Sequence, residues 1–164
     1  MGLILDSSVV IAAERRGDTV EQFIEKIVKA TGDQEAALSA IGLTELIHGI
    51  YRAQTPEIRL RRESFLNELL ADLTVYPYTK ETARLAGKID GEQQSRGMVI
   101  PFGDLLIGAT ALSLGYKVLT EMCIRDRYVA NAAASRRSTQ YWRVFATHRS
   151  SQADLRLHAW SLST

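Results

Sequence analysis

The sequence contains little of what several classes of protein require. It has a single cysteine, Cys123, among 164 residues, which excludes an internal disulfide framework and a zinc site built from cysteines. Its longest apolar stretches, GLIL and VVIAA, are separated by Asp6 and fall far short of the roughly 20 apolar residues that span a bilayer. The first residues also lack the pattern of a secretory signal. These absences predict a cytoplasmic protein that does not enter a membrane.

Glycine-rich phosphate loops are absent as well. Neither GxxxxGK[ST] nor GxGxxG occurs in the sequence, so the nucleotide-binding folds that depend on them are not supported. The segment DSS that follows Asp6 has no second aspartate, which an aspartyl-phosphatase loop would need. An apolar content of 46% and a charged content of 24% are ordinary for a folded domain. A chain of this length is expected to form one domain with a substantial core.

The apolar pattern predicts four short strands separated by pairs of helices. Strands are expected at residues 2–5, 37–41, 72–78 and 116–120, and helices at residues 8–16, 18–32, 44–53, 56–73, 80–97 and 100–115. In this reading Ser7 or Ser8 caps the first helix, and Gly87 and Gly91 interrupt the fifth. Strands joined through helices need crossover connections, which produce parallel sheets covered on both faces. The predicted fold is therefore a three-layer α/β/α arrangement around a central parallel sheet of four to five strands.

Three acidic residues fall where the carboxyl ends of these strands should meet. Asp6 follows the first strand, Glu45 lies in the first turn of the helix after the second strand, and Asp104 opens the helix before the last strand. The helix dipole favours carboxylates in first turns, so each acid alone also has a purely structural explanation. Three together repel one another and need a cation. With oxygen ligands only, Mg²⁺ or Mn²⁺ fits better than Zn²⁺, and such an ion suits phosphodiester hydrolysis.

Three segments carry a resemblance to a known family. LILDSSVVIAAER, SAIGLTELIHGIYRA and IPFGDLLIGATALSLGYKVLT resemble, in order and spacing, the motif blocks of PIN-domain ribonucleases, most closely the VapC toxins of type II toxin-antitoxin systems. The similarity covers residues 2–120. It implies a PIN-like fold in which Asp6, Glu45 and Asp104 are the catalytic, metal-binding residues of a Mg²⁺- or Mn²⁺-dependent endoribonuclease. It also implies a homodimer, an RNA substrate and inhibition by a cognate antitoxin protein, with Ser8 as a supporting hydroxyl.

Two other functions remain open on the sequence. One is an inactive PIN-like domain that binds an antitoxin or RNA without cleavage, and the other is a hydrolase for a smaller phosphate ester. His48 is interpreted as a polar helix residue and Tyr76 and Tyr78 as edge packing, although either tyrosine could stack on a base. The cluster RLRRE is interpreted as a solvated helix face, with contact to RNA or antitoxin as the alternative.

Residues 121–164 differ in composition from the rest of the chain. Residues 1–120 carry 13 Lys and Arg against 16 Asp and Glu, a net charge of −3, whereas residues 121–164 carry 7 against 3, a net charge of +4. This tail lacks the family's fourth site residue, and neither Glu121 nor Asp126 stands in a recognisable motif. Its segment EMCIRDR is compatible with the codons GAG ATG TGT ATA AGA GAC AG, which resemble the transposon-end adapter of sequencing libraries.

We therefore interpret residues 1–120 as a nuclease domain and residues 121–164 as foreign sequence joined near codon 120. The alternative is a genuine arginine-rich extension that binds RNA. Sequencing the source DNA across codon 120 is expected to show a different, family-like end in place of the adapter codons. An uninterrupted read through the present codons would contradict this interpretation.

Overall fold

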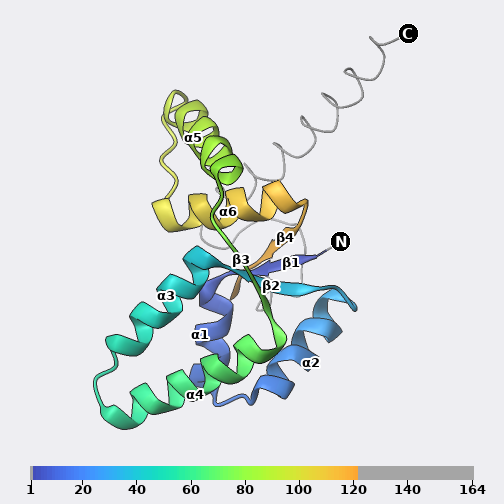
Figure 1. The fold of residues 1–164 in the computed structure, drawn as a ribbon, viewed down its shortest axis with the longest axis vertical. Coiled ribbons are helices and arrows are strands. Elements are labelled where there is room, and N and C mark those ends of the chain that lie inside the picture. The colour runs from blue at the N-terminus through green and yellow to red at the C-terminus, as the bar shows by residue number, and fades with distance from the viewer. Residues whose placement is uncertain (1, 122–164) are drawn as a thin grey trace.

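A parallel β-sheet lies at the centre of residues 2–121, which are the residues that the computed structural model describes (Figure 1). Its strands are β1 (Leu3–Leu5), β2 (Ala36–Ser39), β3 (Thr74–Tyr76) and β4 (Lys117–Leu119), in the order β3-β2-β1-β4. The helices between them are α1 (Ser7–Arg16), α2 (Val20–Thr31), α3 (Ala40–Tyr51), α4 (Pro56–Asp72), α5 (Lys80–Gln94) and α6 (Phe102–Leu114). The predicted succession of strands and helix pairs is confirmed.

The two faces of the sheet build two separate parts of the core. Side chains alternate along a strand, so Leu3 and Leu5 of β1 pack with α1, α2 and α4, while Ile4 packs with α6 on the other face. Figure 1 shows α5 and α6 on one side of the sheet and α1, α2 and α4 on the other. Because β1 is covered on both faces, all three of its residues are buried, and the predicted three-layer architecture is confirmed.

The connection between β2 and α3 differs from the prediction. The strand ends at Ser39 and the helix begins at Ala40 rather than near Thr44. The cause is a helix cap, because the Ser39 hydroxyl accepts a hydrogen bond of 3.0 Å from the backbone N–H of Gly42. Glu45 consequently lies in the second turn of α3, and the prediction that it lies in the first turn was wrong.

Two other local predictions were also wrong. The cap of α1 is Asp6, whose side chain accepts from the backbone N–H of Ser8, so neither serine is the cap. Helix α5 continues through Gly87 and Gly91 without interruption. Each glycine costs about 1 kcal/mol in a helix interior, but Ala86 and Ile89 of the same helix are buried against α6. Tertiary packing therefore overrides the local preference.

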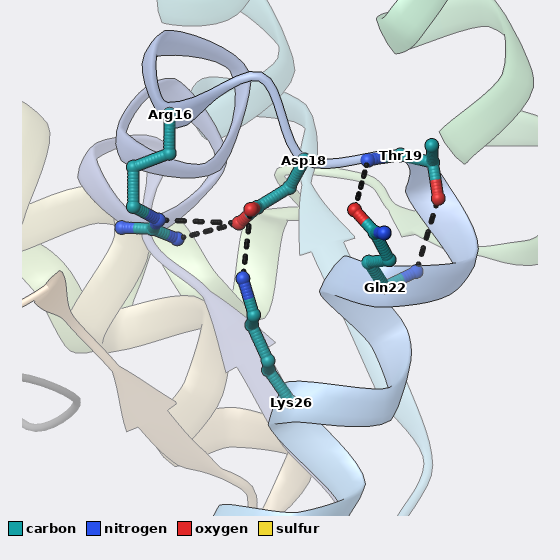
Figure 2. A network of polar contacts seen from close by, with 5 residues as sticks. All are labelled: Arg16, Asp18, Thr19, Gln22 and Lys26. Atoms are coloured by element: carbon teal, nitrogen blue, oxygen red, sulfur yellow. Dashed lines mark hydrogen bonds and ion pairs between the residues drawn. The ribbon is translucent and has the colours of Figure 1, made fainter.

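The junction between α1 and α2 is held by polar contacts, drawn in Figure 2. Asp18 forms ion pairs with Arg16 at 3.1 Å and with Lys26 at 2.7 Å, and Thr19 and Gln22 form a reciprocal capping box at the start of α2. Burial opposes ionisation of Asp18, but the hydrogen bonds and charges of Lys26 and Arg16 outweigh it, and they lower the pKa of the carboxyl. These contacts fix the direction in which the chain leaves α1.

The strand order places β1 at the point where the chain changes direction across the sheet. The chain moves from β1 to β2 and β3 on one side, and it then crosses to β4 on the other side of β1. In open α/β sheets, ligands bind at this switch point, beyond the carboxyl ends of the strands. Asp6 lies at that position, and its backbone N–H donates to the carbonyl of Leu119 at 3.0 Å.

Two sequence interpretations concern the chain beyond this sheet. Residues 122–164, which make up all but the first residue of the proposed foreign tail, lie outside the described residues. Among residues 2–121, none of the helices combines the length and the apolar character needed to cross a membrane.

The Ser39 cap at the start of α3 can be tested by its contribution to stability. Changing Ser39, which is 1% exposed, to Ala removes the acceptor of the Gly42 N–H. We expect the free energy of unfolding to fall by about 1 to 2 kcal/mol, measured by urea unfolding. Thr44→Ala on the exposed side of the same helix is the control, with an expected change within about 0.5 kcal/mol. Equal changes in the two variants would contradict the capping role.

Candidate active site

Asp6 lies at the carboxyl end of the central strand and is the first of the candidate acids. It is 9% exposed. One carboxylate oxygen, Oδ2, accepts hydrogen bonds from the backbone N–H and the hydroxyl of Ser8. The Ser8 hydroxyl in turn accepts from the backbone N–H of Glu121 at 3.3 Å. The predicted supporting residue, Ser8, therefore links Asp6 to the segment that follows β4.

Glu45 projects from α3 toward the same edge of the sheet. Its Oε2 accepts a hydrogen bond of 2.6 Å from the hydroxyl of Ser7, at the start of α1. Its other oxygen, Oε1, lies against the backbone of Gly103, where any side chain would overlap it. The carboxylate of α3 is thus held between the first turns of α1 and α6, and Gly103 is the residue immediately before Asp104.

Asp104 lies in the first turn of α6 and is half-buried. Burial raises the pKa of its carboxyl, and the negative charges of Asp6 and Glu45 raise it further. The charges of Asp6 and Glu45 both act on Asp104, so the three acids share one electrostatic neighbourhood. Elements far apart in the chain therefore bring the predicted residues to one edge of the sheet.

No basic side chain neutralises this neighbourhood within the described part of the chain. The ion pairs found between residues 2 and 121 involve other acids, namely Asp18, Glu14 and Glu92. Within residues 2–121, the hydrogen-bond donors to the carboxylates of Asp6 and Glu45 are serine hydroxyls and a backbone N–H group. The site therefore carries a negative charge that a bound cation would offset.

The donor set fits a hard divalent cation, although the acids do not close into a cage. Within residues 2–121, no three Asp, Glu, His or Cys side chains approach closely enough to surround one ion. Mutual repulsion keeps carboxylates apart, and here Ser7 and Ser8 hold two of them. Mg²⁺ usually takes only one or two carboxylates and keeps several waters, so a closed cage is not required. The oxygen donors and their shared charge favour such an ion.

Ser7 is a site residue that sequence reasoning assigned only to helix capping. Its hydroxyl bonds to a residue 38 positions away, and nothing in the local pattern indicates that partner. The signal available in the sequence was the pair of serines directly after Asp6, which places two hydroxyls next to a candidate acid.

Two of the remaining candidates, Tyr76 and the cluster RLRRE, have structural partners. Tyr76 packs edge-on against Tyr116, with ring centroids 5.8 Å apart, and its hydroxyl donates to Glu35 at 3.1 Å. The interpretation of Tyr76 as edge packing is therefore confirmed. In the cluster RLRRE, Arg61 pairs with the buried Glu14 at 2.7 Å. That arginine joins α4 to α1 and is not simply part of a solvated face.

Comparisons with known proteins agree with this arrangement. The family model of the PIN domain matches residues 3–121. The chain belongs to the VapC branch of the PIN-domain family. It is 31% identical over 120 residues to ribonuclease VapC1 of Rickettsia felis, a match covering 73% of this chain and 84% of that protein. Ribonuclease VapC of Rickettsia bellii is 32% identical over the same shares of each chain.

Solved structures of VapBC proteins share the fold. A crystal structure of VapBC2 from Rickettsia felis bound to a promoter DNA fragment has a TM-score of 0.63 at 18% sequence identity. The match covers 82% of this chain and 100% of that chain. VapBC-5 of Mycobacterium tuberculosis, from a family of toxin-antitoxin systems, has a TM-score of 0.58 at 26% identity, covering 74% and 86%. The predicted PIN-like architecture is therefore confirmed in this VapC chain.

The repulsion at Asp104 predicts a gain in stability when its charge is removed. A carboxyl whose pKa is raised on folding does not reduce the free energy of unfolding below pH 3.8, its pKa in the unfolded chain. The reduction grows as the pH rises through the pKa of the folded state. Asp104→Asn should therefore melt a few degrees higher than the unchanged protein at pH 7 in chelator, with the difference shrinking toward pH 4. A variant that is less stable at pH 7 would contradict the repulsion.

Proposed function

We propose that this chain is an endoribonuclease toxin that hydrolyses RNA phosphodiester bonds and is inhibited by a cognate antitoxin. The observation that carries the proposal is the gathering of three carboxylates at the switch point of a VapC-family sheet, with no basic partner among the described residues. The relatives named as VapC ribonucleases support the activity, and the VapBC structures support an antitoxin partner.

The three acids have distinct proposed roles. Asp6, which is buried and accepts from both the backbone N–H and the hydroxyl of Ser8, is proposed as the fixed acid beside which the reacting phosphate lies. Glu45 is oriented by Ser7 and has its other oxygen beside Gly103, and we assign it the role of accepting a proton from the attacking water. Asp104, whose pKa is raised by burial and by the charges of Asp6 and Glu45, is the proposed third ligand of the cation.

We propose that Asp6, Glu45 and Asp104 hold Mg²⁺ or Mn²⁺. When bound, the ion would supply charge stabilisation for the phosphoryl oxygens and would lower the pKa of water. The chain itself supplies the orientation of the oxygens, through Ser7, Ser8 and the Gly103 backbone. It also supplies the low exposure of Asp6, which strengthens electrostatic interactions at that point.

The assembly of the toxin is also a proposal. In keeping with its family, we propose that this chain forms a homodimer and that an antitoxin covers the acidic site. We further propose that the nuclease unit comprises residues 1–120 and that residues 121–164 are foreign to it. The end of the PIN-domain match at residue 121 supports that boundary.

One observation favours the second candidate, an inactive PIN-like domain that binds RNA or antitoxin without cleavage. The acids within residues 2–121 do not close around a single point. Titration with Mn²⁺, followed by calorimetry, separates the two candidates because a dead site should show no saturable binding that depends on Asp6.

The catalytic proposal predicts the loss of metal-dependent cleavage when any of the three acids is neutralised. We expect Asp6→Asn, Glu45→Gln and Asp104→Asn each to reduce Mn²⁺-dependent cleavage of a single-stranded RNA by at least about 100-fold, with folding checked by circular dichroism. Asp72→Asn, at the exposed end of α4, is the control and should retain full activity. Full activity in any one of the three variants removes that residue from the mechanism.

A further inference from the structure

A groove of about 540 Å³ includes Glu45 in its lining. Its walls come from α1, α3, α4 and the connection between α3 and α4, and they include Arg15, His48, Arg52, Gln54 and Arg62. This volume lies within the range of sites that hold small organic ligands, about 300 to 1,000 Å³. A proposed catalytic acid thus shares the groove with basic and polar side chains, and the apolar residues Ile11, Ala53 and Ile58 complete the lining.

The charge lining this groove is almost entirely of one sign. Glu45 is the only acid among the described residues that line it, whereas three arginines and a histidine do so. Arg15 and Arg52 are exposed, and neither forms an ion pair with any residue from 2 to 121. Residues 1–120 carry a net charge of −3, so this basic lining is not the consequence of a generally basic protein.

The third arginine, Arg62, is held in place by contacts with α3 and α1. Arg62 of α4 donates to the backbone carbonyl of Gly49 in α3 at 2.7 Å, and its Nε lies 3.5 Å from Oε2 of Glu14. Glu14 is 6% exposed and is also bound by Arg61 at 2.7 Å. The buried carboxylate therefore fastens α4 to α1, and Arg15 and Arg52 are left with their charges available across the groove.

We infer that this groove is the path of the RNA backbone beside the cleavage point, with Arg15 and Arg52 binding phosphates next to the scissile one. The inference rests on the proposed function, since it places the substrate of the same site. Guanidinium groups bind phosphate oxygens through two parallel N–H donors, which suits a repeating phosphate chain. Arg15 and Arg52, which form no ion pair within residues 2–121, share the groove with Glu45 and would draw the polyanion toward a negatively charged site.

The chemistry of the groove favours a nucleic acid over a peptide. The neighbouring apolar cavity, lined by Val10, Leu46, Phe65 and Leu66, measures only about 90 Å³, which suits a single small side chain. The larger space is the basic one, and its Gln54 and His48 side chains can donate hydrogen bonds to phosphate or sugar oxygens. A protein partner seated on the arginines is the competing occupant, and the test separates the two.

The test measures the salt dependence of RNA binding by the full-length protein in chelator, where no cleavage occurs. Fluorescence anisotropy with a labelled single-stranded oligoribonucleotide is recorded from 50 to 300 mM KCl for Arg15→Ala, Arg52→Ala and the double variant. Each lost phosphate contact should flatten the slope of log K against log salt by about 0.7 and weaken binding by about threefold or more. The double variant should show the sum of the two changes in slope.

Two sets of controls separate charge from structure. Arg16→Ala changes the neighbouring arginine of α1, whose side chain turns away to Asp18, and should leave the slope unchanged (Figure 2). Arg15→Lys and Arg52→Lys keep the charge, and they should restore the slope while recovering only part of the affinity. A merely structural role for these arginines would not produce this pattern.

Each outcome decides the inference. Unchanged slopes in both alanine variants, or no RNA binding by the unchanged protein, would overturn it. Weakened binding of an antitoxin protein by these variants with RNA binding unaffected would assign the groove to the protein partner and would also overturn it. Flattened slopes in a protein that binds RNA but does not cleave it when Mn²⁺ is added would leave the inference standing and remove the proposed activity.

Discussion

The main physical constraint on this site is the repulsion between the carboxylates that the fold brings to one edge of the sheet. Two unit charges about 4 Å apart repel by roughly 1 to 4 kcal/mol, according to the local dielectric. Here the cost is visible in the raised pKa of Asp104, which burial and the charges of Asp6 and Glu45 produce together. The hydroxyls of Ser7 and Ser8 reduce it by donating hydrogen bonds to the other two acids.

The fold tolerates this cost because hydrophobic burial fixes the elements that carry the acids. The residue before Asp6, Leu5, is fully buried at 0% exposure, and the residue after Asp104, Leu105, is 3% exposed. Strand β1 is packed on both faces, which fixes the position of its carboxyl end at the site. The acids are therefore held in place by the packing of the elements that carry them and not by attraction among the acids themselves.

The arrangement of charge beyond the acids follows from the same constraint. A polyanionic substrate is repelled by a negative site unless cations lie along its approach. The groove beside Glu45 has that character, with Arg15 and Arg52 unpaired among the described residues and Arg62 committed to Glu14 and Gly49. The buried Glu14 thus serves a structural purpose that differs from that of the acids at the sheet edge. Glu14 is neutralised by ion pairs with Arg61 and Arg62, whereas Asp6, Glu45 and Asp104 form no ion pair within residues 2–121.

The sequence by itself determined the order of strands and helices, the parallel sheet and the positions of Asp6 and Asp104 relative to their elements. These features depend on local periodicity and on residues adjacent in the chain, which a sequence displays directly. It misplaced the start of α3, because the Ser39 cap acts over only three residues and competes with a strand pattern of similar length. Only the tertiary structure decided that Ser7 holds Glu45, that Gly103 leaves room for that carboxylate, and that arginines from two helices line one groove. Those contacts join residues tens of positions apart, and their geometry is set by how helices pack on the sheet, which local patterns do not contain.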